Sequence, residues 1–269
     1  MSPSTLDGDF KPVDAGSVET AKVSGDWTVE KALATIHPEP PVSNSTSPLP
    51  FFHMLERLKT SKREGWRRFG IEKGESIADH MYRMSLMTML CPPSLASRID
   101  LPKCMKMCLI HDMAESLVGD ITPVDGVAKP EKSRREAETM DYISNGLLGG
   151  VYSGLAGAEI RAIWQEYEDS KTLESLFVHD IDKMELLCQM VEYEKRMNHT
   201  LDLGEFAYVA TKVVLPETQE WAKDILKERE NFWAGKGHVQ GDHRANGGVS
   251  EQKVEQQDAY YSKDDASTA

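Results

Sequence analysis

Residues 109–120 read LIHDMAESLVGD, and this stretch gathers ionisable side chains at the end of an apolar segment. His111 and Glu115 are four residues apart and Asp112 and Glu115 are three apart, so each pair shares a face if the segment is helical. His111 and Asp112 diverge by about 100° around a helix axis, yet both side chains can reach one point that lies between their two directions. A divalent cation is one such point, and Asp120 follows directly after the glycine that would end the helix.

Two ligands are too few to hold a metal ion, so further ligands must come from other segments. Imidazole and carboxylate ligands together suit Mn, Fe, Co, Zn or Ni. His80 lies in a methionine-rich segment, and Asp182 lies in VHDIDKME, where a buried aspartate without a partner would be costly. The candidate ligands are therefore two histidines and two aspartates from three predicted helices: His80, His111, Asp112 and Asp182.

Spacing alone leaves a second interpretation open. A single histidine on an apolar helix is more often a satisfied core residue than a metal ligand. The chain also contains another His-Asp dipeptide, at His179-Asp180, so the dipeptide by itself is weak evidence for a metal site. From the residues alone, a metal site and ordinary core packing are about equally supported.

The elements that must position these side chains are predicted to be helices. Apolar residues recur with helical spacing through the central chain, and alternating β-branched runs are absent. The predicted helices cover residues 51–60, 76–91, 101–118, 130–148, 156–170, 172–197 and 218–233. This pattern predicts an all-α fold, a helical bundle.

Local signals mark where two of these helices begin. Ser76 is followed three residues later by Asp79, which resembles a capping box. Asp100 is a good N-cap for the next helix, and Pro102 suits its first turn. Gly119 is a good helix stop, so the predicted helix 101–118 ends just before Asp120.

The two ends of the chain differ in composition from its centre. Residues 1–49 are rich in Pro, Ser and Thr and are predicted to form a disordered extension, in which WTVEKALATI is compatible with a short helix. Residues 235–269 are polar and glycine-rich and are predicted to form a disordered tail. Residues 50–234 are the predicted folded domain, and His238 and His243 are expected to be solvated.

The overall charge limits the classes of partner. The chain has 269 residues and a formal net charge of −13 at pH 7. An acidic protein repels a phosphate backbone, so a nucleic-acid polymer is not an expected partner. A small phosphorylated substrate remains compatible, because a bound cation can reverse the local sign of the charge.

The cysteines and the N-terminus indicate a reducing compartment. Cys91, Cys104, Cys108 and Cys188 contain no CxxC pair, so a structural zinc site is not indicated, and Cys104 and Cys108 are expected to pack in the core. Neither a secretory signal nor a transit peptide is visible, which predicts a cytoplasmic location and leaves the nucleus open. No apolar run reaches the roughly eighteen residues that a membrane span needs.

Several long sequence segments resemble those of the HD-domain 5′-deoxynucleotidases, members of the HD superfamily of metal-dependent phosphohydrolases. They are LKTSKREGWRRFGIEKGESIADHMYRMSLM, LIHDMAESLVGDITPVDG, EKSRREAE and DIDKMELLCQMVEYE. The resemblance covers about residues 50–233. One departure is Glu64, which stands where the family usually has a small residue and adds a negative charge near the expected phosphate site.

The resemblance implies hydrolysis of deoxyribonucleoside 5′-monophosphates to nucleoside and phosphate by a homodimer. It implies that the four candidate ligands hold a divalent metal, with Asp182 rather than Asp180 as the last ligand. Glu115 would handle a proton or orient the water, and Asp120 would add a second carboxylate. It also implies a weaker second cation site at Glu115, Asp120 and the carbonyl of Ile121, whose oxygen ligands favour Mg²⁺.

Four further residues are interpreted through the same resemblance. Arg63 and Trp66, in KREGW, read unaided as a surface charge and a packed ring, whereas the family implies that Arg63 binds the phosphate and Trp66 packs on the sugar. A flat ring packed on the sugar could exclude a 2′-hydroxyl and would so favour deoxyribonucleotides. Lys132 and Glu136 match a recurring family segment and stay unassigned.

Two alternatives remain at this point. One is another HD reaction, such as hydrolysis of a phosphodiester or a nucleoside triphosphate; a triphosphate site would need more Arg or Lys than KREGW supplies. The other is a degenerate HD fold that serves as a binding module, against which the presence of all four ligands argues.

Overall fold

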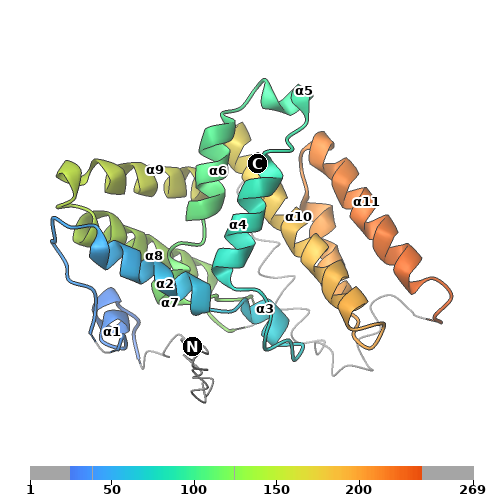
Figure 1. The fold of residues 1–269 in the computed structure, drawn as a ribbon, viewed down its shortest axis with the longest axis horizontal. Coiled ribbons are helices and arrows are strands. Elements are labelled where there is room, and N and C mark those ends of the chain that lie inside the picture. Colours follow the sequence, from blue (N-terminus) through green and yellow to red (C-terminus); the bar gives the residue numbers. More distant parts are fainter. Residues whose placement is uncertain (1–24, 38, 124, 238–269) are drawn as a thin grey trace, which may run out of the picture.

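The structure is a computed structural model, and it describes residues 25–37, 39–123 and 125–237. Its longer helices are α2 (Leu49–Thr60), α4 (Ile77–Thr88), α6 (Leu101–Ile110), α8 (Lys129–Asp141), α9 (Leu155–Asp169), α10 (Leu173–Arg196) and α11 (Pro216–Trp233). Short helical segments connect them: α1 (Val29–Leu33), α3 (Glu64–Arg67), α5 (Pro93–Ala96), α7 (Glu115–Val118), η1 (Tyr142–Leu147), η2 (Tyr152–Gly154) and η3 (Gly204–Lys212). Over the described ranges the β pairing is limited to an isolated bridge, so the predicted all-α class is confirmed (Figure 1).

Side-chain caps determine where α4 and α6 begin. The Ser76 hydroxyl accepts a hydrogen bond from the amide of Asp79 at 3.1 Å, and the Asp79 carboxylate accepts one from the amide of Ser76 at 2.8 Å. This is the predicted capping box. Asp100 accepts a hydrogen bond from the amide of Lys103 at 3.0 Å, which confirms it as the N-cap of α6. The cap of α4 fixes the direction in which His80 leaves that helix.

The segment predicted as one helix over 101–118 is two helices in the structure. α6 ends at Ile110 and α7 begins at Glu115. Between them the amide of Glu115 donates to the carbonyl of Asp112 at 3.0 Å, a three-residue bond that tightens the chain. The prediction of a continuous helix is therefore wrong here, and His111 and Asp112 lie at a turn rather than within a helix.

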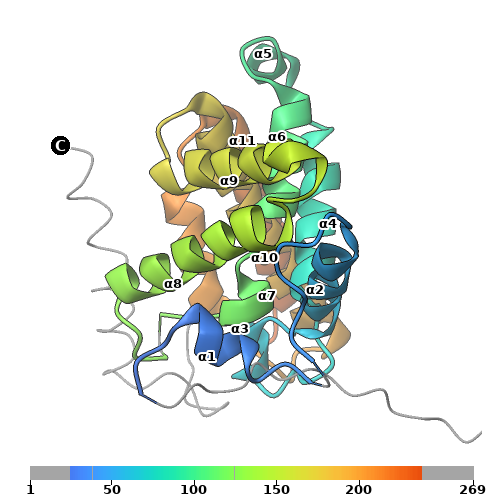
Figure 2. The same cartoon turned by 90° about the vertical axis from the view of Figure 1, so that its left-hand side faces the viewer.

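The core lies where α4, α6 and α10 pack against one another. α10 also contacts α9 and α11, and it runs through the middle of the molecule, while α8 and α9 lie side by side along one flank (Figures 1 and 2). The fully buried side chains of this core include Met84, Met107 and Phe177, each of which contributes about 1.5–3 kcal/mol by burial. Cys104 and Cys108 are buried in the same cluster, as predicted. The helices α4 and α10, and α6 with the turn that follows it, therefore place the His/Asp set on one shared core.

The segment that precedes α2 packs on the bundle. Trp27, which precedes α1, and Ala32, within α1, are buried against Leu117 and Val118 of α7. The structure differs here from the disorder expected over residues 1–49, because an apolar pair in this segment finds an apolar partner surface. Residues 1–24 lie outside the described part of the chain.

The predicted C-terminal tail falls almost entirely outside the described residues, which end at 237. His238 and His243 are among the residues that are not described. None of the described helices combines the length and the apolar character needed to cross a membrane.

Candidate metal centre

Three parts of the fold bring the predicted His/Asp set to one place. His80 projects from α4, Asp182 from α10, and His111 and Asp112 from the turn after α6. The Nε2 atom of His80 lies 3.1 Å from Oδ1 of Asp182 and 3.9 Å from Oδ2 of Asp112. The Nε2 atom of His111 lies 3.2 Å from the same Asp112 oxygen. The four side chains are therefore linked by close contacts into one cluster.

Both imidazole rings are held through their Nδ1 atoms. Nδ1 of His80 lies 2.5 Å from Oε2 of Glu185, and Nδ1 of His111 lies 2.9 Å from the backbone carbonyl oxygen of Cys108. A carbonyl oxygen can only accept, so the proton of neutral His111 must be on Nδ1. A carboxylate favours the same tautomer for His80. Both Nε2 atoms therefore face carboxylates, that of His80 near Asp182 and Asp112 and that of His111 near Asp112.

The buried Nε2 atoms fit a cation ligand set. Among the described residues, neither Nε2 of His80 nor Nε2 of His111 has an aligned hydrogen-bond partner. A buried polar atom without a partner costs about 1–3 kcal/mol, and two such atoms beside two carboxylates are an arrangement that a divalent ion would satisfy. Ligand atoms of His80, His111 and Asp112 lie within 4.8 Å of one another.

The charges around the site also favour a cation. Burial raises the pKa of Asp182, but His80, His111 and Arg63 lower it by more, so this carboxyl ionises well below its usual range. Burial likewise raises the pKa of Asp112, and His111 and Arg63 again lower it by more. Burial and Arg63 lower the pKa of His80, while the carboxylates around it raise it to about 10. Acid groups are therefore in excess, and a divalent ion would displace protons on binding.

Arg63 faces this site from the start of α3. Its Nη1 atom lies 3.2 Å from Oδ2 of Asp112, and its side chain is largely buried. The carboxylate of Asp120 accepts a hydrogen bond from the amide of Glu64, the first residue of α3, at 2.7 Å. Asp120 therefore fixes the segment that carries Arg63. Arg63 is placed to bind an anion above the His/Asp set.

Glu115 is buried at the first turn of α7. The residue is 2% exposed, and its Oε2 atom has no hydrogen-bond partner among the described residues. Burial, together with the charges of Asp112 and Asp120, raises the pKa of this carboxyl well above its usual value. This environment favours the protonated form of the carboxyl relative to an exposed glutamate.

Trp66 is packed more deeply than a surface wall would be. Its indole is 3% exposed and donates a hydrogen bond to Oε1 of Glu75 at 2.7 Å. Its ring centroid lies 5.3 Å from that of Tyr193 and 4.7 Å from that of Phe206. The structure therefore shows Trp66 as a member of a second apolar cluster, and its contact with a sugar stays a prediction.

The residues predicted for a second cation lie in α7 and in the segment that follows it. Glu115 and Asp120 interact electrostatically with each other. The side chain of Ile121 packs on the cluster around Trp27. The role of the Ile121 carbonyl as a ligand stays a prediction.

Several residues near the site were not assigned from the sequence. Glu185, three residues after Asp182 in DIDKME, contacts His80 directly. Lys132 lies 3.6 Å from Glu136, whose pKa is raised to about 7 by burial despite Lys132. Lys132 also lowers the pKa of Glu115, so this pair borders the site. The spacing from Asp182 to Glu185, one helical turn, was the available signal for the first of these.

The second His-Asp dipeptide has a structural role. The Asp180 carboxylate accepts hydrogen bonds from the amides of Val214 and Leu215 at 2.9 and 2.8 Å and from the hydroxyl of Thr218 at 2.6 Å. His179 stacks on the ring of Tyr167, whose other neighbour is His111, with ring centroids 3.9 and 5.0 Å apart. Asp180 therefore anchors the start of α11, whereas Asp182 contacts His80, and its role as a metal ligand stays a prediction.

Comparison with known proteins identifies a common family. Residues 55–221 match the model of the HD domain. The chain is 47% identical over 193 residues to the 5′-deoxynucleotidase hdd1 of Schizosaccharomyces pombe, a match that covers 71% of this chain and 95% of that protein. It is 38% identical over 227 residues to the 5′-deoxynucleotidase YBR242W of Saccharomyces cerevisiae, covering 82% of this chain and 92% of that protein.

A solved structure agrees with these matches. The HD domain-containing protein YGK1 superposes with a TM-score of 0.55 and is 33% identical in sequence. That superposition covers 76% of this chain and 93% of the solved chain. The helical arrangement and the sequence phrases around the site therefore point to the same relatives.

Proposed function

The chain belongs to the HD-domain family, and we propose that it is a metal-dependent 5′-deoxynucleotidase that hydrolyses deoxyribonucleoside 5′-monophosphates to deoxynucleosides and phosphate. The observation that carries the proposal is the approach of the buried Nε2 atoms of His80 and His111 to the carboxylates of Asp182 and Asp112, at 3.1 and 3.2 Å. The 47% identity to a 5′-deoxynucleotidase over nearly all of that protein supports the same substrate class. We place the catalytic domain at residues 50–234.

The His/Asp set would hold the catalytic metal. Nitrogen and carboxylate ligands fit Mn, Co, Fe, Zn or Ni, and the oxygen ligands proposed at Glu115, Asp120 and Ile121 fit a second ion such as Mg²⁺. When bound, such an ion supplies positive charge to the phosphoryl oxygens and lowers the pKa of a coordinated water. Every other contribution comes from the side chains around it.

Arg63 would bind the phosphate. Its guanidinium already lies at the edge of the site against Asp112, and two parallel N–H groups match two phosphate oxygens. Asp120 holds the α3 segment that presents Arg63, so the phosphate would be fixed relative to the His/Asp set. With the phosphate fixed beside the His/Asp set, the attack of water on phosphorus would occur between groups that are already bound and oriented in one site.

Glu115 would handle a proton or orient the attacking water. Its buried carboxyl lies one turn beyond His111, and its unpartnered Oε2 atom is available to a group in the site. Proton transfer by a positioned side chain contributes about 10²–10⁴-fold to a rate. We therefore assign catalytic roles to Glu115 and, as the second carboxylate near the mouth, to Asp120.

A preference for deoxyribose is proposed to arise at Trp66. The indole follows Arg63 by three residues, and its hydrogen bond to Glu75 fixes the plane of the ring. A rigid apolar surface near the ribose would disfavour a 2′-hydroxyl, although by only about 10²-fold. We expect little selectivity among bases.

We also propose that the protein is a homodimer located in the cytoplasm or nucleus. Support for self-association comes from an apolar stripe on α4 and the residues after it: Tyr82, Leu86, Met89 and Leu90 are 62%, 42%, 56% and 75% exposed. A stripe of this kind on one helix face marks an interaction surface. Light scattering coupled to gel filtration tests the dimer, and Leu86→Glu should then give a monomer.

The decisive experiment is phosphate release from a panel of nucleotides. The protein is stripped of metal, and each divalent ion is added back separately. We expect release from dAMP, dGMP, dCMP and TMP after metal addition, and none before it. Conversion of cyclic dinucleotides or nucleoside triphosphates, followed by chromatography because a diesterase frees no inorganic phosphate, without release from the monophosphates would contradict the proposed activity and favour another HD reaction.

A further inference from the structure

A buried carboxylate contacts the Nδ1 edge of the His80 ring. Its Nδ1 atom lies 2.5 Å from Oε2 of Glu185, one turn after Asp182 on α10. Both His80 and Glu185 are 0% exposed. The carboxylate and the candidate metal point therefore lie on opposite edges of the same imidazole ring.

Glu185 is in turn held by Arg83 of α4. The Nε atom of Arg83 donates to Oε1 of Glu185 at 2.7 Å, and Nη2 of Arg83 also contacts that oxygen. The same guanidinium donates to Glu192 at 2.7 Å and to the side-chain oxygen of Gln189 at 3.0 Å. The two oxygens of Glu185 thus have separate partners, one on each side of the buried carboxylate.

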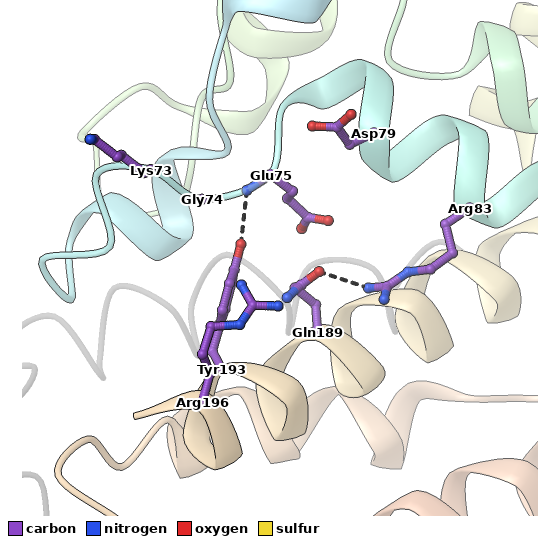
Figure 3. Close-up of a pocket in the computed structure, with 8 residues that line it drawn as sticks. All are labelled: Lys73, Gly74, Glu75, Asp79, Arg83, Gln189, Tyr193 and Arg196. Atoms are coloured by element: carbon purple, nitrogen blue, oxygen red, sulfur yellow. Dashed lines mark hydrogen bonds between the residues drawn. The ribbon is translucent and has the colours of Figure 1, made fainter. Parts of the chain in front are cut away.

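This chain of contacts ends at a pocket in the surface. The pocket has a volume of about 280 Å³ and is lined by Arg83 and Gln189 together with Glu75 and Tyr193. Figure 3 shows the guanidinium of Arg83 turned toward Gln189 along one wall of this pocket. The contacts therefore run from the Nδ1 edge of His80, through the protein interior, to groups that reach solvent.

We propose that Glu185 and Arg83 are positioning residues for the metal ligand His80. A carboxylate that accepts from Nδ1–H keeps the lone pair on Nε2, fixes the plane of the ring and makes the nitrogen a stronger ligand. Arg83 holds that carboxylate at the required angle. The inference rests on the proposed function, because it assumes that the His/Asp set binds a metal.

A purely structural role for this Glu–Arg pair is the alternative, and α10 offers a matched control. Glu194, on the same helix, is also 0% exposed and pairs with Arg229 through two hydrogen bonds of 2.9 Å. Its further partners are the indole of Trp233 and the amide of Leu203, and no described histidine is among them. Loss of Glu194 removes a buried ion pair without touching a metal ligand.

The test measures metal affinity rather than activity alone. Wild-type protein, Glu185→Gln, Glu185→Asp and Glu194→Gln are loaded with Mn²⁺ and titrated with a competing chelator, and their melting temperatures are recorded. Second-layer partners of metal-binding histidines typically contribute about 10–100-fold to affinity, so Glu185→Gln should bind Mn²⁺ more weakly by that factor. Glu185→Asp, which keeps the charge, should recover part of the loss. Glu194→Gln should lower the melting temperature and leave Mn²⁺ affinity unchanged.

A less buried variant keeps the inference testable if Glu185→Gln does not fold. The side chain of Arg83 is 30% exposed, so Arg83→Gln is expected to fold, and it should weaken Mn²⁺ binding by less than Glu185→Gln. Unchanged affinity in Glu185→Gln, or in Arg83→Gln when that variant alone folds, overturns the inference while leaving the nucleotidase proposal intact. A wild-type protein that binds no divalent ion and releases no phosphate overturns both.

Discussion

Asp120 accepts a hydrogen bond from the backbone amide of Glu64 at 2.7 Å, and this bond joins the loop after α7 to the first residue of α3. Arg63, the residue before Glu64, faces Asp112 from the same segment. The carboxylate that the family resemblance implies to be catalytic is thus also the anchor of the phosphate-binding segment. The two roles have different kinetic consequences.

We predict that Asp120→Ala raises the KM for dAMP by at least about tenfold, because a hydrogen bond to a charged group is worth about 1.5–3 kcal/mol. Loss of the anchor frees the segment that carries Arg63 and weakens phosphate binding. Steady-state kinetics with saturating metal measure the effect, and Arg63→Ala in the Asp120→Ala background should then cost less than it does alone. A lower kcat with an unchanged KM would instead assign Asp120 to the chemical step.

We predict that Asp182→Ala loses both bound metal and activity while its helical circular dichroism is preserved. The Asp182 carboxylate is 3.1 Å from Nε2 of His80, and its side chain is 30% exposed, so its loss should be tolerated by the fold. Metal content per chain after gel filtration measures the effect. Asp180→Asn, which breaks the hydrogen bonds to the start of α11, is the control and should lower stability but keep metal. Full metal occupancy in Asp182→Ala would remove Asp182 from the ligand set.

We predict that Glu115→Ala keeps metal at the His/Asp site and lowers kcat by about 10²–10⁴-fold, the usual scale for a residue that transfers a proton. The buried carboxyl is placed beside the site but is not part of the close group of His80, His111 and Asp112. Turnover of dAMP and metal content are measured on the same preparation. Glu138→Ala, an exposed carboxylate on α8, serves as the control. Near-normal turnover in Glu115→Ala would exclude the proposed role.

The local features of the fold follow from neighbouring residues, which is why they could be predicted. The Ser76–Asp79 capping box and the Asp100 cap need only side chains three residues apart. The break after Ile110 could not be predicted, because apolar spacing continues on both sides of it. The burial of Trp27 depends on Leu117, which is distant in the sequence.

The site likewise has a part that could be predicted from the sequence and a part that depends on tertiary packing. The His/Asp set could be proposed because each member is a polar residue in an apolar helix pattern, and close contacts link the four side chains. Glu185 was missed because a glutamate among the other charged residues of that helix has many ordinary explanations. Only the packing of α4 against α10 brings it 2.5 Å from His80.

A pH effect on stability is predicted for His179. Burial and Lys183 lower the pKa of this histidine from 6.5 to about 4. Between pH 6.5 and 4 the unfolded chain therefore binds a proton that the folded protein does not, so the free energy of unfolding should fall as the pH falls through this range. Above pH 6.5 both states are neutral and the contribution is constant.

The difference between wild-type protein and His179→Gln isolates this effect from other titrating groups. Melting temperatures of the two proteins are compared from pH 7.5 to 4, with metal present at saturation above pH 6. The wild-type curve should fall more steeply than the curve of the variant below pH 6.5. Parallel curves would show that His179 does not titrate as its buried stacking on Tyr167 implies.

Trp66 provides the test of sugar specificity. Its indole is 3% exposed, donates to Glu75 and packs against two aromatic rings, so the ring is rigid. A rigid apolar surface rejects an added hydroxyl by only about 10²-fold, so the wild-type protein should prefer dAMP over AMP without excluding AMP. Trp66→Ala would remove the surface, and the ratio of kcat/KM for dAMP over AMP should fall toward one, partly through faster hydrolysis of AMP.

The deep packing of this indole requires a control for stability. Truncation of a buried tryptophan to alanine costs about 3–5 kcal/mol, so the assays must be run well below the melting temperature of the variant. Trp66→Phe keeps an apolar ring but loses the hydrogen bond to Glu75, and it should retain most of the preference if the surface itself excludes the hydroxyl. If Trp66→Ala slows dAMP and AMP hydrolysis equally and the ratio is unchanged, then Trp66 only packs the second apolar cluster. The deoxyribose preference would then have to come from the loop that follows Asp120.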